Sequence, residues 1–162
     1  LTDDMIKALA AKGGIMGINF SCDFLSQKAK DANPMNRPEA IAERERIMRE
    51  VKDQAEAMRQ FRAMMAKFRG QQVRATLNDV LDHIDHVVKL VGVNHVAIGS
   101  DFDGIGCTPE GLDDTSKFEN LTRGLLERGY SPADIAKIYH GNLIRVLRDV
   151  EKTAVQLKAG SK

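Results

Sequence analysis

Two short apolar runs interrupt the helical spacing of hydrophobic positions along the chain. Residues 14–20 read Gly-Ile-Met-Gly-Ile-Asn-Phe, and residues 96–100 read Val-Ala-Ile-Gly-Ser. Strands buried on both faces of a parallel sheet are apolar throughout, whereas half-exposed strands alternate. Each run follows a segment with helical periodicity. The pattern therefore predicts an α/β fold with two parallel strands among many helices.

Several helices carry recognisable start signals. Thr2 is a good N-cap for a first helix that ends before the first apolar run. Thr76 and Asp79 have the spacing of a capping box at the start of a second helix. Ser131 followed by Pro132 marks the start of a later helix. These signals predict helices around both strands and at the end of the chain.

The region between the two runs divides into two parts. Residues 21–37 contain Asn33, Pro34 and Asn36 and are followed by Pro38, which predicts a loop. Residues 38–68 carry apolar side chains mostly three and four positions apart, which predicts an amphipathic helix or a pair of helices. A lid, an oligomer contact and a peripheral helix packed on its own domain are all consistent with this pattern.

Asp101 directly follows the second run. Side chains alternate along a strand, so this pattern groups Asp101 with Ala97 and Gly99, opposite Val96 and Ile98. Open parallel sheets and barrels build their sites at the carboxyl ends of strands. The position suits either a functional carboxylate or one that only caps the next loop.

Metal-binding and redox motifs are weak in this sequence. Asp101-x-Asp103-Gly104 lacks the later acidic positions of a calcium-binding loop. His83 and His86 stand three apart without an HExxH pattern, which favours structural roles. Cys22 and Cys107 form no CxxC and are expected to be free thiols, although the spacing does not exclude pairing.

Composition excludes two classes of partner. The 162 residues carry a net charge of +1, so no overall field favours nucleic acid or a membrane surface. No apolar run approaches the roughly 20 residues of a transmembrane helix. The chain opens on Leu1 without an initiator methionine or a signal peptide, which suggests the later part of a longer protein and leaves its localisation open.

Three motifs, taken in order, carry a family resemblance. They are His-Val-Ala-Ile-Gly-Ser-Asp-Phe-Asp-Gly at 95–104, Pro-Glu-Gly-Leu-Asp-Asp at 109–114 and Asn-Leu-Ile-Arg-Val at 142–146. Together they strongly resemble the membrane dipeptidase (renal dipeptidase) family. The first helix and strand and the segment Asp-His-Ile-Asp-His at 82–86 are similar to the same family, so the resemblance spans nearly the whole chain.

The resemblance implies a fold and a chemistry. Members are (β/α)8 barrels of the metal-dependent amidohydrolase type that hydrolyse dipeptides with two zinc ions. It implies that residues 1–162 form one segment, the C-terminal part of such a barrel, with residues 38–70 as a helical insertion between its last two strands. Asp101 is then the carboxylate that handles the proton of the attacking water, with Asp103 as runner-up, and we predict that Phe20 and Ser21 contact substrate.

The family's metal-binding motifs are absent from this sequence. No early His-x-Asp is present, and none of the four histidines matches a ligand position. We therefore expect that this chain alone holds no zinc and is inactive. Because two strands cannot close a barrel, we also expect a homo-oligomer or association with the missing N-terminal part.

Two other functions are compatible with the residues. The first is a non-enzymatic helical oligomerising module whose strands pair between chains. The second is a phosphatase that uses Asp101 and Asp103 as nucleophile and acid, although that arrangement normally places its strand early in the chain.

Overall fold

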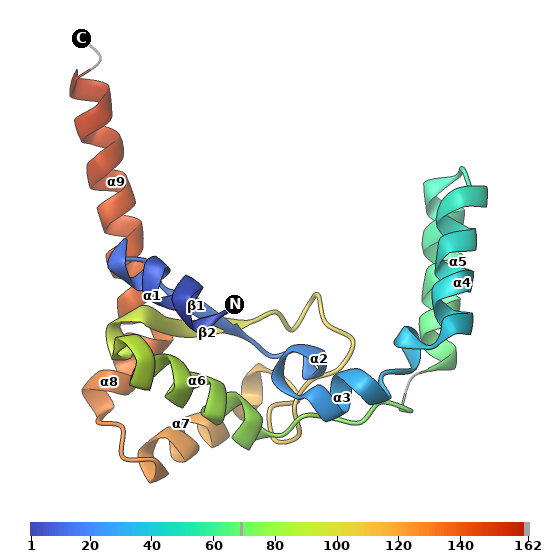
Figure 1. Cartoon of the computed structure of the whole chain (residues 1–162), viewed down its shortest axis with the longest axis horizontal. Helices are drawn as coiled ribbons and strands as arrows, with labels where there is room; N and C mark the ends of the chain where they lie inside the picture. Colours follow the sequence, from blue (N-terminus) through green and yellow to red (C-terminus); the bar gives the residue numbers. More distant parts are fainter. Residues whose placement is uncertain (69, 161–162) are drawn as a thin grey trace.

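A computed structural model gives the structure of residues 1–68 and 70–160. Its two strands lie at the centre of a body of helices, and two helical extensions leave that body at opposite ends (Figure 1). The strands and α-helices are α1 Asp3–Ala11, β1 Met16–Asn19, α2 Cys22–Leu25, α3 Gln27–Ala32, α4 Pro38–Glu50, α5 Gln54–Lys67, α6 Leu77–Val91, β2 Val96–Ser100, α7 Phe118–Glu127, α8 Pro132–Ala136 and α9 Asn142–Gly160. Short 3₁₀ turns cover Pro34–Asn36, Val93–His95 and Thr115–Lys117, and a π-helical turn covers Lys137–Gly141.

Strands β1 and β2 pair in parallel and form a two-stranded sheet within the described residues. The crossover between them includes α6, which contacts both strands, and α7 packs on α6. The two parallel strands predicted from the apolar runs are therefore confirmed. No described helix has the length and apolar character needed to span a membrane.

The core lies between the strands and the helices that cover them. Helix α6 supplies an apolar stripe because its hydrophobic positions recur every three or four residues. The largest core side chains with no exposed surface are Phe20, Val80, Ile84, Val96, Leu112, Leu121, Leu125 and Ile138. Helix α6 thus packs directly on both strands, and α7 covers α6.

The predicted helix starts are present in the structure. The Thr2 hydroxyl accepts a hydrogen bond from the Met5 amide at 3.4 Å. Thr76 and Asp79 form the full capping box, in which each side chain accepts a hydrogen bond from the other residue's backbone amide. These three bonds satisfy backbone amides at the helix starts that have no partner within the helix. The capping predictions at these two positions are confirmed.

Residues 21–37 are helical, so the prediction of a loop is wrong. Ser26 caps α3 by accepting a hydrogen bond from the Ala29 amide, and Asn33 caps the following 3₁₀ turn. Pro34 and Pro38 occupy the first positions of the two elements that follow. Proline is well tolerated there because the first amides of a helix have no acceptor. These residues mark helix starts rather than an irregular loop.

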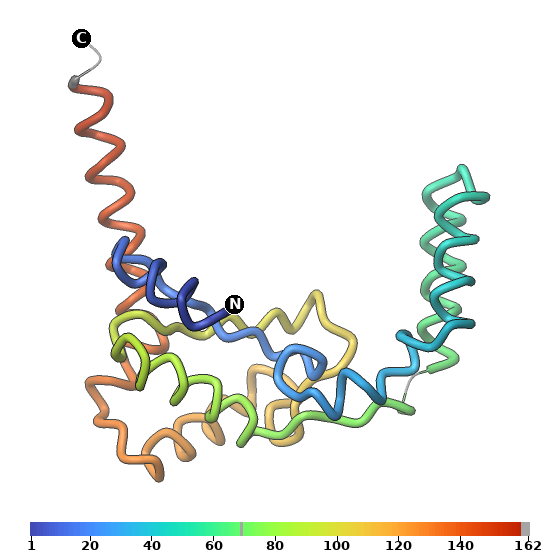
Figure 2. Tube along the Cα trace, viewed as in Figure 1, coloured from blue at the N-terminus to red at the C-terminus, as the bar shows by residue number. Residues whose placement is uncertain are grey.

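Residues 38–67 form a pair of helices rather than one long helix. The periodicity predicted one or the other. The chain is extended at Val51, and Asp53 starts α5 by accepting a hydrogen bond from the Glu56 amide at 2.7 Å. Helices α4 and α5 pack side by side as a hairpin that stands away from the body (Figure 2). At the carboxyl-terminal side of the fold, α9 continues to Gly160.

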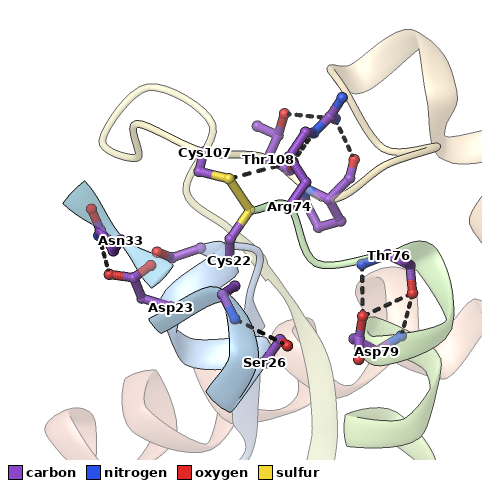
Figure 3. The surroundings of a disulfide bond; sticks show 12 residues. Cys22, Asp23, Ser26, Asn33, Arg74, Thr76, Asp79, Cys107 and Thr108 are labelled. Atoms are coloured by element: carbon purple, nitrogen blue, oxygen red, sulfur yellow. Dashed lines mark hydrogen bonds between the residues drawn. A yellow bond between two sulfur atoms is a disulfide. The ribbon is translucent and has the colours of Figure 1, made fainter. Parts of the chain in front are cut away.

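Cys22 and Cys107 form a disulfide, so the prediction of free thiols is wrong (Figure 3). Their Cα atoms are 5.6 Å apart although 85 residues separate them in sequence. The strand register brings together the segments that follow the two strands, and the Cys22 amide donates a hydrogen bond to the Cys107 carbonyl at 3.3 Å. This contact depends on tertiary structure, which is why the spacing in sequence did not reveal it.

Helix α9 is tied to the amino ends of both strands. The buried Asn142 amide donates to the Val93 and Val96 carbonyls at 2.7 and 2.8 Å. Arg145 donates to the Gly13 and Asn94 carbonyls at 2.8 and 3.0 Å. These bonds satisfy carbonyl groups where each strand begins, and they fix the last helix against the sheet.

Candidate active site

The carboxyl end of β2 has an unusual backbone. Ser100 and Asp101 have φ angles of +39° and +74°, the positive-φ non-glycine residues of the described chain. Such conformations are costly for residues with a Cβ and concentrate at functional sites. The turn also ends the strand alternation at Ser100. The grouping of Asp101 with Ala97 and Gly99 therefore does not hold, although Asp101 does lie at the strand's carboxyl end.

A bulge in the sheet precedes this turn. Ile18 pairs with Ile98 but Asn19 pairs with Ser100, so Gly99 is an extra residue in β2. A Cβ at Gly99 would lie 3.0 Å from the Gly17 carbonyl carbon and from the Ile18 oxygen. Glycine at this position therefore lets the two backbones approach closely. The bulge places Ser100 opposite Asn19 at the end of β1.

The Asp101 carboxylate is exposed, and the end of β1 holds it in place. The Asn19 side-chain amide donates a hydrogen bond to Asp101 Oδ2 at 2.9 Å. Asn19 Oδ1 accepts a hydrogen bond from the Ser21 backbone amide at 2.7 Å. The side chain of Asn19 therefore bridges the chain just after β1 to the carboxylate just after β2.

A tight turn follows Asp101. The Asp101 carbonyl accepts hydrogen bonds from the amides of Gly104 and Ile105 at 3.0 and 3.2 Å. A Cβ at Gly104 would collide with Asp101 Oδ1, so a larger residue there would displace the carboxylate from its place over the turn. Asp103 is exposed within this turn.

An aromatic cluster anchors the turn to the core. The ring of Phe102 lies 5.5 Å from that of Phe20 and 6.0 Å from that of Phe118, in edge-to-face arrangements. Tyr139 extends the cluster, and burial raises the pKa of its hydroxyl. Phe20 has no exposed surface and Ser21 is half-buried at the start of α2. Their contact with substrate stays a prediction.

Two further contacts fix the loop that follows. The disulfide joins Cys107 to the segment after β1. Arg74 donates hydrogen bonds to the Thr108 and Pro109 carbonyls, both at 2.8 Å, and pairs with Asp113 (Figure 3 shows its bond to Thr108). The loop that begins at Asp101 is therefore held at its start, middle and end.

Three of the histidines have hydrogen-bond partners away from this turn. The ring of His83 donates to the Leu25 carbonyl at 3.1 Å, and the ring of His95 donates to the Gly14 carbonyl at 2.8 Å. His86 pairs with Asp3 at 2.8 Å, and His140 is exposed. Within residues 1–68 and 70–160, no three His, Cys, Asp or Glu side chains are grouped so that they would hold a metal ion.

Sequence reasoning found Asp101 but missed the residues that hold it. Asn19 lies within an apolar run, and only the strand pairing shows that it faces Asp101. Arg74 lies outside any motif, and its partners are 34 to 39 residues away in sequence. The asparagine at the end of the first strand was the one available signal, because a polar residue there is unusual in an apolar strand.

Comparison with protein families gives one match over nearly the whole chain. The family described as "Membrane dipeptidase (Peptidase family M19)" matches residues 1–161. Dipeptidase aclJ of Aspergillus oryzae is 49% identical over 83 residues, which are 51% of this chain and 20% of that protein. An uncharacterized dipeptidase of Schizosaccharomyces pombe is 30% identical over 156 residues, which are 96% of this chain and 27% of that protein. The chain thus spans 20% to 27% of these two relatives.

Solved structures give the same architecture. The probable dipeptidase PvdM from Pseudomonas aeruginosa matches with a TM-score of 0.65 at 26% identity, over 90% of this chain and 39% of that chain. A metallo peptidase from Rhodobacter sphaeroides matches with a TM-score of 0.60 at 23% identity, over 91% of this chain and 30% of that chain. These likenesses confirm the predicted fold class, a helix-rich part of an amidohydrolase-type (β/α)8 barrel.

Proposed function

Because this chain belongs to the membrane dipeptidase family, we propose that it is the C-terminal part of a metal-dependent dipeptidase. The observation that carries the proposal is the carboxylate of Asp101, exposed at the carboxyl end of β2 on a left-handed backbone. Barrel enzymes place their catalytic groups at this end of their strands. The substrate class would be dipeptides, cleaved at their single peptide bond.

Asp101 would act as the general base and then as the general acid. Its carboxylate would accept a proton from the attacking water and pass that proton to the amine that leaves. The geometry supports this role because the carboxylate is exposed and is held by Asn19 and the turn at Gly104. A fixed carboxylate loses less freedom when substrate binds than a mobile one.

We propose that zinc is the cofactor and that residues outside this chain bind it. The described residues do not fit a zinc site, because they offer no group of three ligands. The 162-residue chain alone would therefore not hydrolyse dipeptides. The Cys22 and Cys107 sulfurs are joined to each other and are not thiolate ligands.

The test uses the full-length protein that carries this chain. Asp101→Asn removes the base while keeping the size of the side chain, and kcat for dipeptide hydrolysis should fall about 10²- to 10⁴-fold. Asp103→Asn is the matched control, because Asp103 is an exposed carboxylate two residues away in the same turn. If Asp101→Asn retains the rate of the parent, Asp101 is not the base and the proposal fails.

We also propose that the free edge of β1 associates with the rest of the barrel. A groove of about 790 Å³ runs along β1 and is lined by Met16, Gly17, Ile18 and Asn19 together with parts of α1, α2 and α6. Strand edges with unpaired backbone groups favour addition of another strand. Mixing this chain with the remaining part of the protein should give one complex in size-exclusion chromatography with light scattering. Two separate species would contradict the proposal.

A homo-oligomer of the isolated chain is the alternative outcome of the same measurement. The hairpin of α4 and α5 then becomes a candidate contact, because Met48 and Met58 are 78% and 51% exposed on it. We propose that residues 38–70 are an insertion between the last two barrel strands. Deleting the hairpin should leave the secondary structure of the body unchanged, as measured by circular dichroism.

A further inference from the structure

We propose that Asn19 is a positioning residue that fixes which oxygen of Asp101 carries the proton in catalysis. The inference deepens the proposed function and rests on Asp101 as its base. Asn19 would hold Oδ2 of the carboxylate as an anchor and leave Oδ1 to exchange the proton with water and the leaving amine. Asn19 would act through Asp101 and would not touch the reacting atoms itself.

The orientation of the Asn19 amide follows from its two partners. The Ser21 backbone amide only donates hydrogen bonds, so the Asn19 atom 2.7 Å from it must be the oxygen. The NH2 group then necessarily faces Asp101, 2.9 Å from Oδ2. A flipped amide would put two donors against each other at Ser21 and two acceptors against each other at Asp101. Asn19 is therefore a donor toward the carboxylate.

The two carboxylate oxygens of Asp101 have different surroundings. Oδ2 receives the hydrogen bond from Asn19, which occupies a lone pair on that oxygen. Oδ1 lies over Gly104, where even a Cβ would collide with it. No hydrogen bond joins Oδ1 to another residue of the described ranges. Oδ1 is thus the oxygen left to accept a proton.

The backbone explains why a separate positioning residue is needed. Ser100 and Asp101 both have positive φ, a conformation that persists only where surrounding contacts determine it. Asn19 ends β1 at the point where the register shifts, directly opposite Ser100. The side-chain bond from Asn19 and the backbone bond from the Phe20 amide to the Ser100 carbonyl, at 2.9 Å, tie this turn to β1.

The experiment measures kcat and KM for dipeptide hydrolysis in the full-length protein. Asn19→Ala should lower kcat about 10- to 100-fold with little change in KM, because the carboxylate is misplaced but substrate contacts remain. Asn36→Ala is the matched control, because its amide also donates one hydrogen bond, to the Lys30 carbonyl at 2.9 Å. That variant should keep the parent's kcat.

A double-mutant cycle separates positioning from a general structural effect. If Asn19 acts through Asp101, Asn19→Ala should have no further effect in the Asp101→Asn background. Asn19→Asp adds a second readout, because a protonated carboxyl at position 19 donates to Oδ2 as the amide does. Its activity relative to the parent should therefore recover as the pH falls below neutral, where the facing carboxylates share one proton.

The outcomes distinguish the two proposals. If Asp101→Asn is inactive while Asn19→Ala matches the control, the positioning role is wrong and the proposed function stands. If the losses from Asn19→Ala and Asp101→Asn multiply in the double variant, Asn19 acts independently and the inference is also overturned. If Asp101→Asn keeps the parent's rate, the proposed function fails.

Discussion

Removal of the Cys22–Cys107 disulfide should strongly destabilise this chain. The bond joins the segments that follow the two strands, across 85 residues of sequence. A cross-link removes conformational entropy from the unfolded chain, and a loop of this length corresponds to about 4.6 kcal/mol at 25 °C in the chain-entropy model. Domains are stable by only about 5–15 kcal/mol, so the loss would be a large fraction of the total.

Urea unfolding followed by circular dichroism measures this effect. With a slope of about 2 kcal/mol per molar urea, reduction should lower the midpoint by roughly 2 M. The double variant Cys22→Ser with Cys107→Ser should unfold near the midpoint of the reduced parent and should not respond to reductant. It is the control for effects of the reductant on the rest of the chain.

Thiol titration tests the bond itself. The chain has two cysteines, so the unreduced protein in denaturant should show no free thiol and the reduced protein should show both. Equal urea midpoints for the oxidised and reduced chains, with the thiols titrated as stated, would refute the entropic reasoning. Free thiols before reduction would refute the disulfide.

Two further predictions concern stability. Asn142→Ala should lower the free energy of unfolding by about 2–4 kcal/mol, because it leaves two carbonyls at the start of β2 without their donor. Asn120→Ala, which removes one half-buried bond to the Gly111 carbonyl, should lower the free energy of unfolding by less in the same urea titration. The pKa of Tyr130 is raised, mainly by burial and next by the hydrogen bond to Asp85. The stabilisation that this neutral hydroxyl provides is therefore complete below the unfolded tyrosine pKa of about 10 and is lost as the pH rises above it. Tyr130→Phe should therefore lose less stability than the parent between about pH 9 and about pH 11.5, and equal losses would contradict this account.

Local signals predicted much of the fold. The capping residues Thr2 and Thr76 act within one turn of backbone, so their effect is readable from three or four neighbouring residues. The apolar runs at β1 and β2 were readable because burial on both faces removes alternation. Residues 21–37 were misread because proline and asparagine mark both loops and helix starts, and only the surrounding contacts decide between them.

The sequence by itself determined the two parallel strands, the helices around them, the family resemblance and Asp101 as the candidate base. Each of these depends on neighbouring residues or on a continuous motif. The tertiary structure alone decided that Asn19 faces Asp101, that Cys22 pairs with Cys107 and that the chain turns left-handed at Ser100. These features require segments some 80 residues apart to meet, and that meeting is set by strand register and packing, which no local pattern encodes.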